Sequence, residues 1–230
     1  MSNYRFDSIL DIIGPEMIGP SSSHTAGAVR IGLACKSILN DKLLSVRIRL
    51  YNSFAETGSG HGTRKALLAG LMGFSKADKR IKNAEQIFKL KKIKYSIEKI
   101  YKPNNYPPNT AVINMSSKKW DIEVIGESIG GGLIRIKEID GFAVNITGDN
   151  ETLIITHKDR IGILSEILNV LSLYKLNIVT INSVRHNKLD DIKTIITFDN
   201  FINPRMRSIL TSIQDVVRTR IIHKIQEKWQ

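Results

Sequence analysis

The order of segments in the last third of the chain is the strongest constraint on the fold. The apolar patterns of strands occupy residues 152–157, 177–185, 192–199 and 216–225, and those of helices occupy 160–174 and 203–213. Strand–helix–strand–strand–helix–strand is the order of a ferredoxin-like βαββαβ unit. In the first helix, the spacing predicts a buried face formed by Ile161, Leu164, Leu168 and Leu171.

The residues before this unit have a different organisation. Helical patterns occupy 21–39 and 64–73, and strand patterns occupy 43–54, 93–100, 111–116, 120–128, 132–140 and 142–148. The residues Ile-Asp-Gly at 139–141 predict a hairpin between the last two strands. The composition changes at residues 148–150, so we expect two domains, 1–148 and 149–230. The predicted fold class is α/β, in the broad sense of α+β.

The formal net charge of +12 raises the question of a nucleic-acid partner. Much of the excess lies in residues 75–102, which hold ten basic and three acidic residues. Ala77, Ile81, Ala84 and Phe88 recur there at helical spacing, which places the lysines on the outer face of a helix. No zinc-finger, helix-turn-helix or aromatic RNA-binding motif accompanies the segment, so we interpret it as a solvated helix face and expect no nucleic acid.

The chain has a single cysteine, Cys35. It can form no disulfide within the chain and cannot hold a zinc ion or an iron–sulfur cluster by itself, so we expect no metal site in this chain. We expect Cys35 to be buried in a helix as a small apolar side chain. The sequence shows no signal-peptide pattern and no apolar run of ~20 residues, which predicts a cytoplasmic protein with no membrane partner.

A short polar turn precedes the first helix of the second domain. Asp159 and Gly162 lie where a strand passes into this helix, and free backbone N–H groups at such a position can hold a small anionic or zwitterionic ligand. This turn and the element order over 150–224 resemble the ACT domain, a family of small amino-acid-sensing modules. An Asp159 side chain that only caps the helix would give the same pattern.

A second polar stretch, Ile-Gly-Pro-Ser-Ser-Ser-His-Thr-Ala-Gly at 18–27, precedes the first helix of the chain. One serine would cap a helix, but three serines followed by His24 and Thr25 exceed what capping needs. Together they can offer hydroxyl, N–H and imidazole groups to one carboxylate-bearing ligand. A Ser–His nucleophile pair is disfavoured, because adjacent residues at a helix start seldom direct a hydroxyl to a neighbouring imidazole and no GxSxG motif is present.

A second histidine, His61, lies in the glycine-rich sequence Gly-Ser-Gly-His-Gly-Thr at 58–63. Glycine permits close approach of the backbone to a ligand, and histidine moves protons near neutral pH. A structural role would explain either histidine alone. Both histidines precede a threonine and a helix, however, so the two loops can converge at the ends of strands.

Four stretches carry a close resemblance to a known family, at 11–32, 51–63, 107–113 and 127–142. They are similar to the β subunit of the iron–sulfur-dependent L-serine dehydratases (L-serine ammonia-lyases) of the two-chain bacterial type. The resemblance implies an N-terminal domain related to the allosteric substrate-binding domain of some phosphoglycerate dehydrogenases. It also implies conversion of L-serine to pyruvate and ammonia with a separate, cysteine-rich α subunit that holds a [4Fe–4S] cluster, whose iron acts as a Lewis acid.

The same resemblance implies roles for individual residues. The donors of Ser21, Ser22, Ser23, His24 and Thr25 suit the carboxylate of L-serine. His24 and His61 are both candidates for proton transfer, and the sequence leaves the choice open. Further substrate-binding candidates are Asn109 and Thr110. The glycines at 130–132 either approach the cluster or the partner chain, or only connect two strands.

Other hypotheses stay open at this level. A non-catalytic regulatory subunit built from the same two domains would bind an amino acid without turnover. For either function, we expect homodimerisation through the ACT-like domain or the N-terminal domain.

Overall fold

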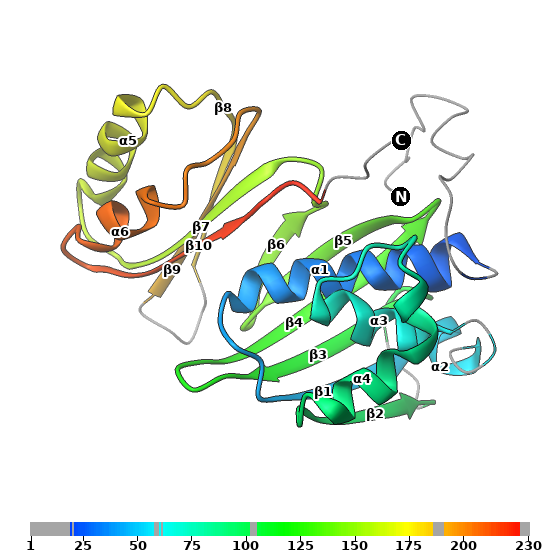
Figure 1. Ribbon diagram of the computed structural model, residues 1–230. Coiled ribbons are helices and arrows are strands. Elements are labelled where there is room, and N and C mark those ends of the chain that lie inside the picture. The colour runs from blue at the N-terminus through cyan, green and yellow to red at the C-terminus, as the bar shows by residue number, and fades with distance from the viewer. Residues whose placement is uncertain are drawn as a thin grey trace.

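The computed structural model describes residues 19, 21–57, 60, 62–101, 105–185 and 191–225. These residues form two β-sheets with flanking helices (Figure 1). The first sheet has six strands and the second has four. The predicted α+β class is confirmed, because helices accompany one mixed sheet and one antiparallel sheet.

The six-stranded sheet is built by the first half of the chain. Its strands are β1 Ser45–Tyr51, β2 Lys94–Ile100, β3 Thr110–Ser116, β4 Asp121–Gly130, β5 Leu133–Ile139 and β6 Phe142–Ile146. The order is β2-β1-β3-β4-β5-β6, with β1 and β2 parallel and the other neighbours antiparallel. The predicted hairpin joins β5 to β6, where Asp140 and Gly141 have the left-handed φ values of 52° and 80° that a tight hairpin turn needs.

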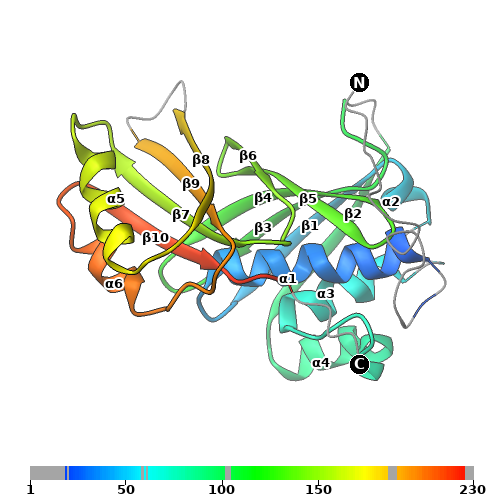
Figure 2. The same cartoon turned by 90° about the horizontal axis from the view of Figure 1, so that it is seen from above.

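Helices cover one face of this sheet. They are a π-helical turn Ser22–Ala26, α1 Gly27–Leu39, α2 Ser53–Thr57, α3 Thr63–Met72, a 3₁₀ turn Lys79–Asn83 and α4 Ala84–Leu90. Figure 2 shows α1, α3 and α4 on the same side of the strands. α1 and α3 cross with their backbones in contact at Gly32 and Gly70, and a Cβ atom at Gly32 would lie 2.5 Å from the Leu67 carbonyl oxygen. Glycine is therefore required for this crossing.

The second half of the chain has the predicted element order. It contains β7 Glu151–Lys158, α5 Ile163–Leu173, β8 Ile178–Arg185, β9 Asp191–Phe198, α6 Met206–Thr211 and β10 Val216–Ile222. The sheet is antiparallel with the order β10-β7-β9-β8, so the βαββαβ arrangement is confirmed. The assignment to the ACT family, the likeness of the first half to an allosteric substrate-binding domain and the boundary at 148/149 stay predictions.

The buried face of α5 agrees with the prediction only in part. Leu171 is buried and Leu168 packs against the core, as predicted, whereas Ile161 is 100 % exposed and Leu164 is 38 % exposed. The other buried side chains are those of Ile163 and Ile167. The helix begins only at Ile163, so Ile161 lies before it. The i, i+4, i+8 row that starts at Ile163 then faces the sheet.

The basic segment at 75–102 also forms less helix than predicted. Ala77 is exposed because it precedes the 3₁₀ turn, and α4 begins only at Ala84. Ile81, Ala84 and Phe88 are buried as expected. In the part of the chain that the structure describes, no helix is long and apolar enough to cross a membrane.

The two sheets share one hydrophobic core. Ile154, Ile195 and Ile222 of the second sheet belong to the same cluster of buried side chains as Ile31 of α1 and Ile136 of β5. A second cluster joins the other face of the four-stranded sheet to α5 and α6. The four-stranded sheet is therefore covered by the first half of the chain on one face and by its own helices on the other.

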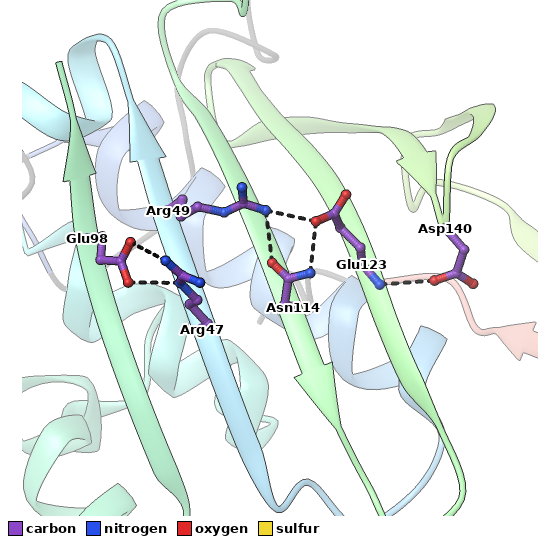
Figure 3. Close-up of polar contacts among 6 residues, drawn as sticks. All are labelled: Arg47, Arg49, Glu98, Asn114, Glu123 and Asp140. Carbon is purple, nitrogen blue, oxygen red and sulfur yellow. Dashed lines mark hydrogen bonds and ion pairs between the residues drawn. The ribbon is translucent and has the colours of Figure 1, made fainter. Parts of the chain in front are cut away.

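The opposite face of the six-stranded sheet carries a polar ladder (Figure 3). Arg47 and Arg49 alternate with buried residues along β1, so they point away from the helices. Arg47 donates to both carboxylate oxygens of Glu98, at 2.8 and 2.9 Å. Arg49 Nη2 donates to Asn114 Oδ1 at 3.0 Å and to Glu123 Oε2 at 2.8 Å.

Candidate active site

The serine-rich stretch forms a π-helical turn that leads directly into α1. Ser21 is the N-cap of this turn, with extended backbone angles, and its hydroxyl accepts a hydrogen bond from the backbone N–H of His24 at 3.2 Å. Ser21 therefore does cap the helix. Capping accounts for only one of the three serines.

The imidazole of His24 is surrounded by hydroxyl groups. Its Nδ1 lies 3.2 Å from Ser21 Oγ and 3.1 Å from Ser23 Oγ, and its Nε2 lies 3.0 Å from Ser53 Oγ. The ring also packs edge-on against Phe54 at a centroid distance of 5.5 Å. The half-buried ring is thus held from both nitrogens. The expectation that a neighbouring hydroxyl would not reach this imidazole was wrong, because the π-helical turn brings Ser23 close.

Ser53 was not among the residues predicted from the sequence. It is the first residue of α2 and follows directly on β1, after Asn52 in a left-handed conformation with φ of 51°. The only signal in the sequence is a polar Asn-Ser pair at the end of a strand, where functional residues tend to occur.

The loop before β3 is hydrogen-bonded to the turn that holds Ser53. Asn52 Nδ2 donates to the carbonyl oxygens of Tyr106 at 2.6 Å and Pro107 at 3.3 Å. The Thr110 hydroxyl donates to the Pro107 carbonyl oxygen at 2.9 Å, and Thr110 is fully buried. The turn that holds Ser53 and the loop that holds Thr110 are therefore locked together.

Asn109 connects this loop to the glycine-rich segment. Its side-chain Nδ2 donates to the Ser128 carbonyl oxygen at 3.3 Å, and its backbone carbonyl oxygen accepts from the Ser128 N–H at 3.0 Å. Asn109 Oδ1 is buried and has no hydrogen-bond partner among the described residues. The side chain of Ser128 in turn fills the space where a Cβ atom of Gly27 would lie, so this segment packs on the start of α1.

The three glycines at 130–132 connect β4 to β5. All three have positive φ, at 100°, 58° and 81°, which favours glycine at each position. Arg30 of α1 donates to the Gly132 carbonyl oxygen at 3.2 Å and to Asp149 Oδ1 at 2.9 Å. The strand-connection role is confirmed, and the approach to a cluster or partner stays a prediction.

The remaining N-terminal candidates have different surroundings. Thr25 is 2 % exposed and packs against Gly19, where a Cβ atom would lie 2.5 Å from Thr25 Oγ1. Ser22 accepts the N–H of Gly27 on its backbone carbonyl. His61 lies outside the described residues. Thr63, two residues later, begins α3 and is fully buried, and its hydroxyl has no hydrogen-bond partner in the described part of the chain.

The candidate ligand loop of the second half has no such cluster of hydroxyls. Asp159 pairs with Arg185 of β8, and the N-cap of α5 is Gly162, with φ of 85° and no side-chain cap. The alternative that Asp159 caps the helix is therefore wrong. Whether Asp159 and Gly162 bind a ligand stays a prediction.

Cys35 is fully buried in α1, as predicted, and burial raises the pKa of its thiol far above the ordinary value. No group of three or more His, Cys, Asp or Glu side chains among the described residues is arranged to hold a metal ion. A thiol that stays protonated in an apolar core does not fit a cluster ligand.

Fold and geometry define a two-sheet α+β protein in which two segments, the serine turn and the start of α2, place hydroxyl groups around one imidazole at a helix start. Residues 8–122 match the sequence profile of the serine dehydratase beta chain family. The chain is 42 % identical to the probable L-serine dehydratase, beta chain, of Bacillus subtilis (strain 168), over 76 % of this chain and 79 % of the relative. It is 34 % identical to the L-serine dehydratase, beta chain, of Peptoniphilus asaccharolyticus, over 90 % of this chain and 94 % of the relative.

A longer relative, the L-serine dehydratase of Helicobacter pylori (strain J99), is 28 % identical over 75 % of this chain, which corresponds to 41 % of that protein. The protein belongs to the serine dehydratase beta chain family. The resemblance found in the sequence is confirmed.

Proposed function

We propose that this chain is the β subunit of an L-serine dehydratase, which converts L-serine to pyruvate and ammonia. Family membership supports the reaction class. The observation that supports the location of the chemistry is the His24 imidazole, which is held by the hydroxyls of Ser21, Ser23 and Ser53.

The reaction needs a base for the α-proton of serine. Loss of this proton and of the β-hydroxyl gives an aminoacrylate, which tautomerises and hydrolyses to pyruvate and ammonia. A half-buried imidazole that is oriented through both nitrogens suits this proton transfer near neutral pH. His24 and His61 both remain candidates for the base.

The charged groups of L-serine need partners of matching chemistry. The hydroxyls of Ser21, Ser22, Ser23 and Thr25 and the nearby N–H groups would bind the carboxylate. The buried Asn109 Oδ1 accepts no hydrogen bond from the described residues, so it suits the ammonium group of the substrate. Thr110 would act indirectly, because its hydroxyl already donates to the Pro107 carbonyl.

The [4Fe–4S] cluster would belong to a separate α subunit. Cys35 is the only cysteine of this chain and does not fit as a ligand, as argued above. The beta-chain names of two relatives and the greater length of the Helicobacter relative support a partner subunit that supplies the rest of the enzyme. We place the assembled enzyme in the cytoplasm.

The second half of the chain would act as an ACT domain and mediate homodimerisation. Strand β8 lies at the edge of the four-stranded sheet, and Val179 and Ile181 on it are each 45 % exposed. An exposed apolar edge strand favours pairing with a second copy. Ile181→Lys should shift the dimer to monomer in light scattering. Ile209→Lys, at a similarly exposed position on helix α6 and not on an edge strand, should not.

The function is tested by anaerobic co-purification of this chain with a cysteine-rich α subunit. Pyruvate formation from L-serine is assayed for the mixture and for each chain alone. Turnover only in the mixture is the expected result. A stable complex with an intact cluster and no turnover would contradict the proposal and indicate a regulatory subunit.

A further inference from the structure

A small cavity lies where the two halves of the chain meet. It has a volume of about 100 Å³, several times the ~30 Å³ that one water occupies in the liquid. The first half contributes Asn40, at the end of α1, and Trp120, before β4; the second half contributes Arg207, Thr211, Val217, Arg218, Thr219 and Arg220. None of these residues belongs to the candidate active site.

The cavity is strongly cationic. Three arginines line it, and the described lining residues include no carboxylate. The two threonine hydroxyls are fixed in place, since Thr211 and Thr219 Oγ1 are hydrogen-bonded to each other at 2.7 Å and both lie within hydrogen-bond distance of the Arg207 carbonyl oxygen. This part of the cavity lining is thus held by hydrogen bonds, and the lining itself carries positive charge only.

Arg220 shows the imbalance most directly. It is 2 % exposed, and its Nε has no hydrogen-bond partner among the described residues. Its ion-pair partner is Asp140 Oδ2, at 3.6 Å, and Lys193 shares this oxygen at 3.5 Å. The other oxygen of Asp140 accepts the backbone N–H of Glu123 at 3.0 Å (Figure 3). One carboxylate therefore faces two buried cations, and buried charges need compensation.

Arg218 also lines the cavity. Its guanidinium stacks over Trp120 at 3.6 Å from the ring centroid, and Nη2 donates to the Leu39 carbonyl oxygen at 3.4 Å. Burial and the charges of Arg220 and Arg207, opposed in part by Asp140 and Asp41, lower the pKa of Arg218 to about 9. A negative charge in the cavity would relieve this repulsion.

A larger cavity of about 950 Å³ adjoins the first one. The two share Asn40, Arg207 and Thr211, and the larger is also lined by Lys36 and His223. An anionic group held by the three arginines could therefore carry an organic part that extends into this space.

We propose that the three-arginine cavity binds a phosphate group, as inorganic phosphate or as the phosphoryl group of a small phosphomonoester. A phosphate group carries about 1.5 to 2 negative charges near neutral pH and several acceptor oxygens, whereas a monocarboxylate carries one charge. The planar forks of three guanidinium groups match such an oxyanion. Because both halves line the cavity, the ligand would also hold the two sheets together.

The test is calorimetric titration of the full chain with inorganic phosphate at constant ionic strength. We expect saturable binding at one site per chain. Arg207→Gln should weaken it about tenfold, because one charge-assisted hydrogen bond is lost. Arg205→Gln, an exposed arginine beside the same helix that does not line the cavity, is the matched control and should bind like the parent. Thermal unfolding without phosphate checks that both variants fold.

Glycerol phosphate and acetate complete the experiment. Tighter binding of glycerol phosphate would identify a phosphomonoester as the ligand, and equal binding would identify inorganic phosphate. Absence of saturable phosphate binding, equal weakening by the two arginine variants, or acetate binding as tight as phosphate would each overturn the proposal. None of these measurements depends on turnover, so they stand apart from the proposed enzymatic function.

Discussion

Two helix starts in this molecule are preceded by short polar segments, at 21–25 and at 159–162, and they differ in what surrounds them. At the first, the His24 ring contacts hydroxyls of its own turn and Ser53 from another loop. At the second, Asp159 pairs with Arg185, and Ile161 is exposed. A polar segment at a helix start becomes a candidate site when the fold places side chains from another part of the chain beside it. The local sequence alone does not determine whether this happens.

The largest expected effect is on kcat, and it should be seen at the first polar segment and not at the second. His24→Ala should lower kcat of the reconstituted enzyme by about 10²–10⁴-fold, the usual contribution of a general acid or base. Asp159→Ala should leave kcat unchanged, because its carboxylate pairs with Arg185 within the second half of the chain. Pyruvate formation under saturating L-serine measures both. Equal losses would remove the distinction between the two helix starts, and normal turnover in His24→Ala would leave His61 as the base.

Glycine-to-alanine substitutions compare the backbone packing of the two helices, α1 and α5, that follow these polar segments. Gly32→Ala should cost about 2–3 kcal/mol of the free energy of unfolding, because the new Cβ would meet the Leu67 carbonyl oxygen across the α1–α3 contact. Gly162→Ala should cost only about 1 kcal/mol, since its Cβ meets nothing within 4 Å and only the positive φ is strained. Urea unfolding of both variants gives the comparison. A Gly32→Ala variant as stable as Gly162→Ala would show that α1 and α3 can move apart.

Much of the fold follows from the sequence because it depends on local periodicity. Alternation and turn residues defined the βαββαβ order and the hairpin at Asp140 and Gly141. The predicted face of α5 was right for Leu168 and Leu171 and wrong for Ile161 and Leu164, because the pattern did not reveal that the helix begins at Ile163, after the left-handed Gly162. An error of this kind at a helix start changes which row of side chains faces the sheet.

The candidate site was only partly predictable. Ser21, Ser23 and His24 are neighbours in the sequence, so their composition alone drew attention to them. Ser53 joins them through the fold of the six-stranded sheet, and the Thr110 loop is tied in through Asn52 because β1 pairs with β3. Strand order is a non-local property, and no spacing along the chain encodes this convergence.

Ser53→Ala tests whether the contact from outside the serine turn matters. It should lower kcat about tenfold, since the His24 Nε2 loses a hydrogen bond worth about 1 kcal/mol and with it part of its orientation. Ser53→Thr should restore the rate because it keeps the hydroxyl. Ser75→Ala, at an exposed position in the same half, is the control. A normal rate for Ser53→Ala would mean that the 21–25 segment orients His24 without help from another loop.

The smallest expected effect concerns polar groups that the second half buries for packing. Lys193 is 3 % exposed, its Nζ lies over the Phe142 ring at 3.6 Å, and burial, opposed by Asp140, lowers its pKa to about 8. The unfolded chain holds this proton up to about pH 10.5, so between pH 8 and 10.5 it binds more protons than the folded chain and stability rises with pH.

From pH 7 to pH 9, Lys193 should therefore add about 1 kcal/mol to the free energy of unfolding. Urea unfolding in phosphate-free buffer should show this gain in the parent protein and not in Lys193→Met. Other groups titrate in both proteins, so their contributions cancel when the two pH dependences are subtracted. Equal pH dependence in the two proteins would mean that the Asp140 carboxylate and the aromatic ring keep Lys193 charged despite its burial. The buried cations at the junction of the halves would then already be compensated, unlike the imidazole at 21–25, which is held by neutral hydroxyls.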